Sequence, residues 1–193
     1  MPAKKKRRVD TWKTKKWYTI VAPKSFNEKE LGETPSADPE KLVGRTIKAS
    51  LADLTEKRSQ RHINIFFAID KIKGQQANTV ITGHEMQRGY VGRQAKRMKS
   101  LVNTIFEVKT KDKKKAELQV MCLARARMNE KQEKAVRKEI EEEITAKAKK
   151  ENFEKLFQEV VFGKLSAEVF ANTKKIFPVT RMEITKSKIK SEN

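Results

Sequence analysis

Lysine and arginine are the side chains of this chain whose number and spacing could support a defined chemistry. The 193 residues contain 45 Lys and Arg against 25 Asp and Glu, a formal net charge of +20. Because such a surplus repels itself in an isolated monomer, it favours neutralisation by a polyanion. Each phosphate that a cation contacts on a nucleic acid releases a condensed counterion, so nucleic acid is the polyanion that this charge fits best.

The positive charge is concentrated in four stretches. Residues 1–16 carry eight cations against Asp10, and residues 86–99 carry five cations and no acid. Residues 109–115 carry five cations against one acid, and residues 174–193 carry six against two. We predict that exposed residues of these stretches contact RNA phosphates, which positions a protein without reading sequence. The predicted RNA-binding residues are Lys4, Lys5, Lys6, Arg7, Arg8, Trp12, Lys13, Lys15, Lys16, Arg88, Arg93, Lys96, Arg97, Lys99, Lys111, Lys113, Lys114, Lys115, Arg125 and Arg127.

The N-terminal stretch leaves several interpretations open. Dense like charge does not pack on itself, so residues 1–16 are expected to form an arm that folds on binding. The Lys4–Arg8 run fits a phosphate-binding arm, a nuclear import signal or a solvated tail. Trp12 lies among lysines, where an aromatic ring can stack on an unpaired base. Trp17 and Tyr18 open a predicted strand, and we expect Trp17 to fill the core.

Other kinds of site find little support in the sequence. His62, His84 and Cys122 are too scattered to complete a closed zinc site. The usual motifs for a nucleophile, a phosphate loop or a metalloprotease do not occur. Gly89 and Gly92 form a G-x-x-G that fits either a phosphate-binding turn or the start of a helix. We therefore predict a protein without catalytic activity, metal or cofactor.

The sequence also indicates a cellular setting. A single cysteine excludes an intramolecular disulfide and favours an intracellular chain. No apolar run approaches the roughly 20 residues that cross a bilayer, and no apolar segment follows the basic N-terminus as in a secretory signal. We expect a soluble intracellular protein.

The elements that must position the cations are predicted to be strands in the N-terminal two thirds of the chain and helices after about residue 129. Ile63, Ile65, Phe67 and Ile69 alternate with mostly polar residues, a period of two that is typical of a strand. Similar patterns predict strands at 17–21, 46–51, 79–82, 104–109 and 118–122 and around 182–184, with a lysine-rich hairpin near residue 112. Arg125 and Arg127 are expected to alternate outward from the strand at 118–122. The segment 33–39, with two prolines, is predicted to be a loop.

From Asn129 onward the apolar residues recur every three to four positions, which indicates helices. Residues 129–155 contain eight cations and eight glutamates, so their net charge is zero. The neutral helix expected around Val136–Ala148 is the predicted surface for protein neighbours. The predicted fold class is α+β, a small mixed, mainly antiparallel β-barrel or sheet followed by C-terminal helices, with extended basic termini. The expected segments are a basic arm (1–16), a strand-rich body (17–128), a helical segment (129–175), and a last strand with a basic tail (176–193).

Several segments together resemble one protein family. They are Lys16–Pro23 (KWYTIVAP) with Phe26-Asn27, Gly44-Arg45 with Ser50–Leu54 (SLADL), Val108–Asp112 with Val120–Cys122, and Ile176–Val179. Over Arg7–Lys190 the pattern resembles the archaeal and eukaryotic small-subunit ribosomal protein family S-three-A-e, also called eS-one. The chain is similar in length to archaeal members, which makes the import interpretation of Lys4–Arg8 less favoured.

The resemblance implies a small mixed β-barrel flanked by helices, seated on the platform of the small ribosomal subunit. It also implies contact with rRNA near the mRNA exit, neighbouring ribosomal proteins, a cytoplasmic, ribosome-bound location and no enzymatic activity. The alternative is a freestanding basic RNA-binding protein or RNA chaperone that is not stably part of the ribosome.

Overall fold

The computed structural model describes residues 12–190, so the predicted contacts Lys4–Arg8 lie outside the described residues. The chain folds into two compact units, which are described separately here. The first comprises Phe67–Val80 and the described residues up to Ile47, and the second comprises Lys48–Phe66 and those from Ile81 onward. Strands β3 (Thr46–Ser50), β4 (Ile63–Lys73) and β5 (Gln76–Met86) each continue from one unit into the other.

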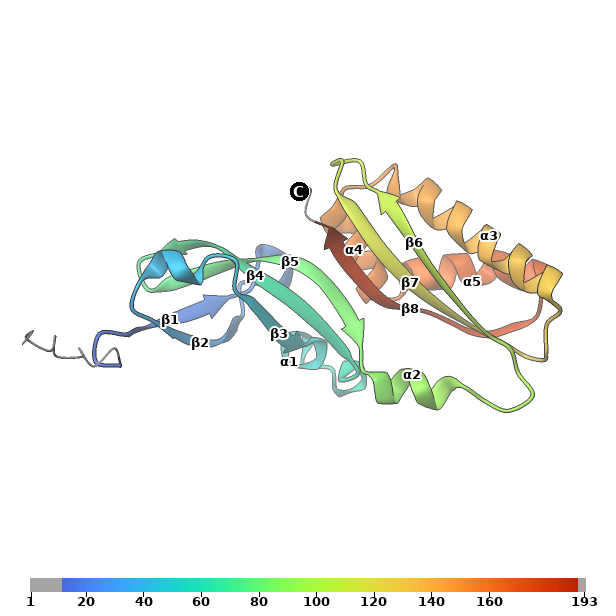
Figure 1. The fold of residues 1–193 in the computed structure, drawn as a ribbon, viewed down its shortest axis with the longest axis horizontal. Coiled ribbons are helices and arrows are strands. Elements are labelled where there is room, and N and C mark those ends of the chain that lie inside the picture. Colours follow the sequence, from blue (N-terminus) through green and yellow to red (C-terminus); the bar gives the residue numbers. More distant parts are fainter. Residues whose placement is uncertain (1–11, 191–193) are drawn as a thin grey trace, which may run out of the picture. The chain divides into compact units, whose positions relative to one another are not determined.

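The first unit is built around β1 (Lys16–Val21), which confirms the strand predicted at this place. β1 pairs antiparallel with β2 (Glu30–Ser36) and parallel with the start of β5, with Ile20 opposite Ala77 (Figure 1). Two single-turn 3-10 helices, η1 (Lys24–Phe26) and η2 (Pro39–Leu42), follow β1 and β2. The core of this unit includes a cluster of Tyr18, Ile20, Leu42, Ile69 and Ala77.

Two sequence predictions in the first unit are wrong. Trp17 remains 58% exposed, whereas Tyr18 is only 5% exposed. Successive side chains of a strand point to opposite faces, so Tyr18 fills the core and Trp17 faces outward. The expected loop at 33–39 is partly strand, because β2 extends to Ser36. Pro35 is tolerated there because β2 lies at the edge of the sheet, where a missing N–H breaks no ladder.

The second unit contains most of the predicted cations, and nearly all of them lie in the segments that connect its strands. β6 (Leu101–Lys109) and β7 (Lys115–Ala124) form the predicted hairpin, and β8 (Val179–Lys190) pairs antiparallel with β7 and with the end of β5. The helices are α1 (Leu51–Thr55), η3 (Arg58–Gln60), α2 (Arg88–Gln94), α3 (Glu130–Ala148), α4 (Phe153–Val161) and α5 (Lys164–Ile176). The three helices after residue 129 confirm the predicted change from strands to helices.

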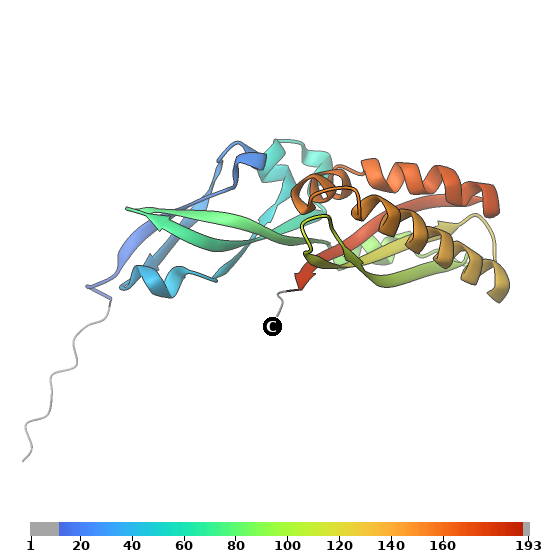
Figure 2. The same ribbon diagram turned by 90° about the horizontal axis from the view of Figure 1, so that it is seen from above.

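Helices α3, α4 and α5 cover one face of β6, β7 and β8 (Figures 1 and 2). α3 packs against β6, and α5 packs against β8. Val136, Ile140 and Ile144 are fully buried and recur every four residues along α3, which is the narrow apolar stripe that the sequence predicts. α2 contacts the opposite face of β8, where the Tyr90 hydroxyl donates to Glu183 at 2.8 Å.

The eight strands form an open sheet. Its order is β2-β1-β5-β8-β7-β6, with β3 paired to β4 and β4 to β5. The fold is therefore α+β with a mainly antiparallel sheet, as the sequence predicts. The sequence also allowed a closed β-barrel. Within residues 12–190 the barrel is not formed, because β2 and β6 end the strand order without pairing to each other.

A buried histidine anchors β5 to β8. Gly83 lies opposite Lys188, and a Cβ added to it would come within 2.1 Å of the Ser187 carbonyl oxygen, so only glycine allows this close pairing. The next residue, His84, is 1% exposed. Its Nε2–H donates to the Ile184 carbonyl at 3.0 Å, so Nδ1 is left to accept from the Ser187 hydroxyl at 2.5 Å. Burial lowers the pKa of His84 from 6.5 to about 4.

Candidate nucleic-acid interface

The β6–β7 ladder brings most of the predicted cations of the second unit to its two opposite ends. The ladder runs from the pair Leu101–Leu123 to the pair Lys109–Lys115. At a rise of roughly 3.3 Å per residue, its ends lie about 26 Å apart. We call the basic residues at the two ends the loop cluster and the hairpin cluster.

The loop cluster consists of Lys96, Arg97, Lys99, Arg125 and Arg127. Two segments that are distant in sequence meet here, because the Ser100 N–H donates to the Ala126 carbonyl and the Ala124 N–H to the Ser100 carbonyl. The Ser100 hydroxyl also accepts from the Met128 N–H at 3.0 Å. Arg125 and Arg127 lie beyond the end of β7, so the expectation that they alternate outward from the strand is wrong; both are exposed on the loop that follows it.

The hairpin cluster begins with Lys111, Lys113, Lys114 and Lys115. A tight turn presents them: the Lys113 N–H donates to the Thr110 carbonyl at 2.9 Å, and the Thr110 N–H donates to the Lys114 carbonyl at 3.0 Å. Lys113 has a left-handed backbone with φ of 61°, a conformation that glycine adopts most readily. The turn therefore carries a cation at a position where the backbone alone favours glycine.

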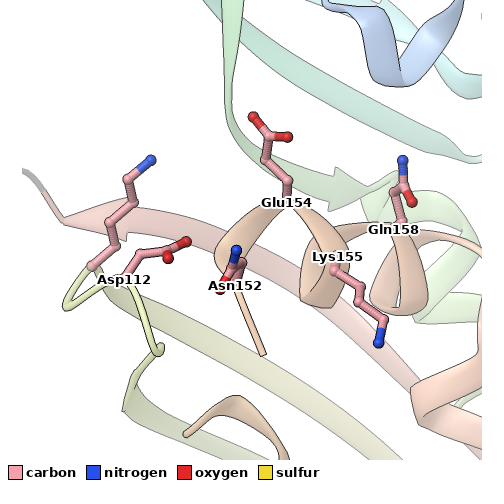
Figure 3. A pocket seen from close by; sticks show the side chains of 6 residues that line it. Asp112, Asn152, Glu154, Lys155 and Gln158 are labelled. Atoms are coloured by element: carbon pink, nitrogen blue, oxygen red, sulfur yellow. The ribbon is translucent and has the colours of Figure 1, made fainter. Parts of the chain in front are cut away.

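The hairpin is tied to the start of α4. The Asp112 carboxylate accepts from the Phe153 N–H at 3.1 Å, and the Lys111 N–H donates to the Glu151 carbonyl. A polar hollow of about 330 Å³ lies beside this contact (Figure 3). Glu154 and Gln158 point to one side of α4 and Lys155 to the other. Since Asp112 is bound to the helix terminus, it anchors the lysines of the turn to a rigid element.

Replacing Asp112 with alanine removes the only side-chain cap of α4 seen among residues 12–190, since Asn152 at the N-cap position provides none. We expect the free energy of unfolding to fall by about 1 kcal/mol, measured by urea denaturation. Asp112→Asn is the matched control, because its side-chain oxygen still accepts the hydrogen bond and should preserve most of the stability. Equal losses in both variants would contradict the assigned cap.

Sequence analysis missed Lys149 and Lys150 as members of the hairpin cluster. Both are exposed in the turn that follows α3, directly before Glu151, whose carbonyl accepts from the Lys111 N–H. They were assigned to a neutral helix because the count over 129–155 balances. Position along the segment is the missing signal. Lys134 pairs with Glu130 and Arg137 with Glu133 in the first turns of α3, whereas Lys149 and Lys150, which follow the helix, form no ion pair within the described residues.

The remaining predicted contacts are placed elsewhere. Arg88 and Arg93 are exposed on α2, where Arg93 Nε donates to the Gly89 carbonyl at 3.1 Å. Gly89 and Gly92 are both helical residues of α2, so the phosphate-turn interpretation is wrong. Trp12, Lys13, Lys15 and Lys16 belong to the first unit, and Lys15 Nζ lies 3.9 Å above the Trp12 ring.

Ion pairing distinguishes the clusters from other cations. Lys190 pairs with Glu107 and with Glu117, and Lys147 pairs with Glu159 at 2.6 Å and Glu168 at 2.5 Å. Within residues 12–190, no ion pair involves the lysines at 111, 113 and 114 or any member of the loop cluster. These charges are therefore available to an anionic partner.

The structure places the candidate metal ligands of the sequence apart. His62 stacks on Tyr90 with ring centroids 3.9 Å apart, His84 is in the core, and Cys122 is buried with its pKa raised to about 12 by burial. Among the described residues, no group of three or more His, Cys, Asp or Glu could hold a metal ion. None of the helices within residues 12–190 is long and apolar enough to span a membrane.

Comparison with known proteins decides the family. The model of the Ribosomal S3Ae family matches residues 3–193. The chain belongs to this family. It is 42% identical to the small ribosomal subunit protein eS1 of Methanobrevibacter smithii, covering 97% of each chain. It is also similar to the proteins of that name from Methanoculleus marisnigri (39%, covering 95% of this chain and 93% of the relative) and Saccharolobus islandicus (41%, covering 93% and 86%). The S3Ae family is one of structural ribosomal proteins and is not an enzyme family.

Proposed function

We propose that this S3Ae-family chain is a structural constituent of the small ribosomal subunit that binds rRNA phosphates through the loop and hairpin clusters. The observation that carries the proposal is the placement of clustered basic side chains at both ends of one rigid β6–β7 ladder, about 26 Å apart. Two separate groups of cations on one rigid element fix the orientation of a protein on folded RNA, because each contact restricts the rotation that the other permits.

We further propose that the subunit surface involved is the platform near the mRNA exit, as the family resemblance implies. In this arrangement the protein is cytoplasmic and ribosome-bound, and it lies close enough to the exit to contact mRNA. The exposed and charge-balanced surface of α3 supports a second role as a contact for neighbouring ribosomal proteins, since its lysines and arginines pair with glutamates on the same helix.

Sedimentation tests membership of the particle. The tagged full-length protein, expressed in an archaeal host, is expected to co-sediment stoichiometrically with small subunits in a sucrose gradient and to remain there at moderate salt. Recovery mainly at the top of the gradient would favour the freestanding RNA-binding protein or chaperone instead.

A further inference from the structure

Both tryptophans of the chain are exposed in the first unit. Trp12 is 64% exposed and Trp17 is 58% exposed, and the chain has no other tryptophan. Tryptophan is the largest side chain and is usually mostly buried, so two solvated rings five residues apart indicate a contact surface.

The strand holds Trp17 in place. Tyr18 is buried in the core of the first unit, and the alternation along β1 then directs Trp17 outward. Trp17 lies opposite Pro35 on β2, and the Thr19 N–H donates to the Gln75 carbonyl at 2.9 Å. The neighbours of Trp17 are paired as well, Lys16 opposite Ser36 and Tyr18 opposite Thr34, so the strand presents the ring on a rigid element.

The positive charge around the two tryptophan rings indicates an anionic partner. Residues 12–17 contain three lysines and no acid, and Lys15 Nζ lies 3.9 Å above the Trp12 ring. Aromatic faces interleaved with cations suit a single strand of nucleic acid, whose bases stack while its phosphates are neutralised. An apolar pocket on a protein would accept the rings but would gain nothing from three adjacent ammonium groups.

We propose that Trp12 and Trp17 form a stacking site for unpaired nucleobases of RNA, with Lys13, Lys15 and Lys16 on the neighbouring phosphates. The inference rests on the proposed RNA-binding function and deepens it, because the loop and hairpin clusters contact phosphates whereas this site contacts bases.

Intrinsic fluorescence reads this site directly, because all tryptophan emission of the full-length protein comes from it. The probes are a single-stranded oligoadenylate of roughly ten nucleotides, an abasic strand with the same number of phosphates, and an RNA duplex. We expect the oligoadenylate to quench the emission and to bind more tightly than the abasic strand, and the duplex to leave the emission nearly unchanged. Trp17→Leu should weaken oligoadenylate binding roughly tenfold without affecting the abasic strand, and Trp17→Phe should restore most of it.

Val80→Ala is the control, because Val80 is a 41% exposed apolar residue of the same unit and should not affect binding. Equal affinity for the oligoadenylate and the abasic strand, or no quenching, would overturn the stacking site and point to a protein neighbour. If salt-dependent binding of the abasic strand persists in that case, the proposed phosphate contacts survive. Failure to bind any of the three probes would overturn both proposals.

Discussion

Removing three lysines from the hairpin turn is expected to weaken binding to small-subunit rRNA about one hundredfold at physiological salt. Each phosphate contact contributes roughly 0.7 to 0.9 to the slope of log K against log[salt], so three lost contacts lower the slope by about two to three. The variant is Lys111→Ala, Lys113→Gly, Lys114→Ala. Glycine is used at 113 because the backbone there has φ of 61°, so the turn should be retained. Binding is measured by filter retention or fluorescence anisotropy over a series of salt concentrations.

The matched control removes three exposed lysines from α3, namely Lys131, Lys134 and Lys138. Two of them pair with glutamates one turn away, Lys134 with Glu130 at 2.7 Å and Lys138 with Glu142 at 3.7 Å. Because the charges of Lys134 and Lys138 are already balanced by these glutamates, the control should change the slope by less than about one unit. The same slope change in both variants would show that total charge, and not the hairpin, determines binding.

Acidification is expected to destabilise the second unit through His84. Burial lowers the pKa of His84 in the folded protein to about 4, whereas the unfolded chain has the ordinary value of 6.5. The unfolded state therefore binds a proton first as the pH falls. Stability is complete above pH 6.5 and is lost between 6.5 and 4, by about 3 kcal/mol in total. Urea denaturation at several pH values measures this loss.

His84→Gln isolates the contribution of the histidine, since glutamine keeps a polar group between Ile184 and Ser187 but does not titrate in this range. Glu85, the neighbouring acid that favours the charged form of His84, is unchanged in the variant. The variant should be less stable than the wild type at neutral pH and should lose much less stability on acidification. Parallel stability curves for the two proteins would rule out His84 as the cause.

The fold was predictable where local pattern and tertiary packing agree. The β6–β7 hairpin and helix α3 follow from residue periodicity, because one face of each element is buried as the pattern requires. Trp17 shows where this reasoning fails: the alternation along β1 allows either Trp17 or Tyr18 to face inward, and the expectation that Trp17 does so was wrong. Whether the strands close into a barrel depends on pairing between distant edges, which no local pattern encodes.

The candidate site was only partly predictable. Charge counts found Lys111 and Arg97, but the meeting of residues 95–100 with 125–128 depends on the pairing of β6 with β7. Lys149 and Lys150 were missed because a balanced count over a helix hides an unpaired end. The role of Asp112 as a cap for α4 spans 41 positions in the chain and becomes visible only in the folded structure.

Ultraviolet cross-linking of purified small subunits, followed by mass spectrometry of the peptide–nucleotide adducts, tests the central claim most directly. We predict rRNA adducts on the segments 96–99, 111–115 and 125–127, and few or none on the exposed surface of α3. Adducts concentrated on α3, with both ends of the β6–β7 ladder free of RNA, would contradict the proposed interface.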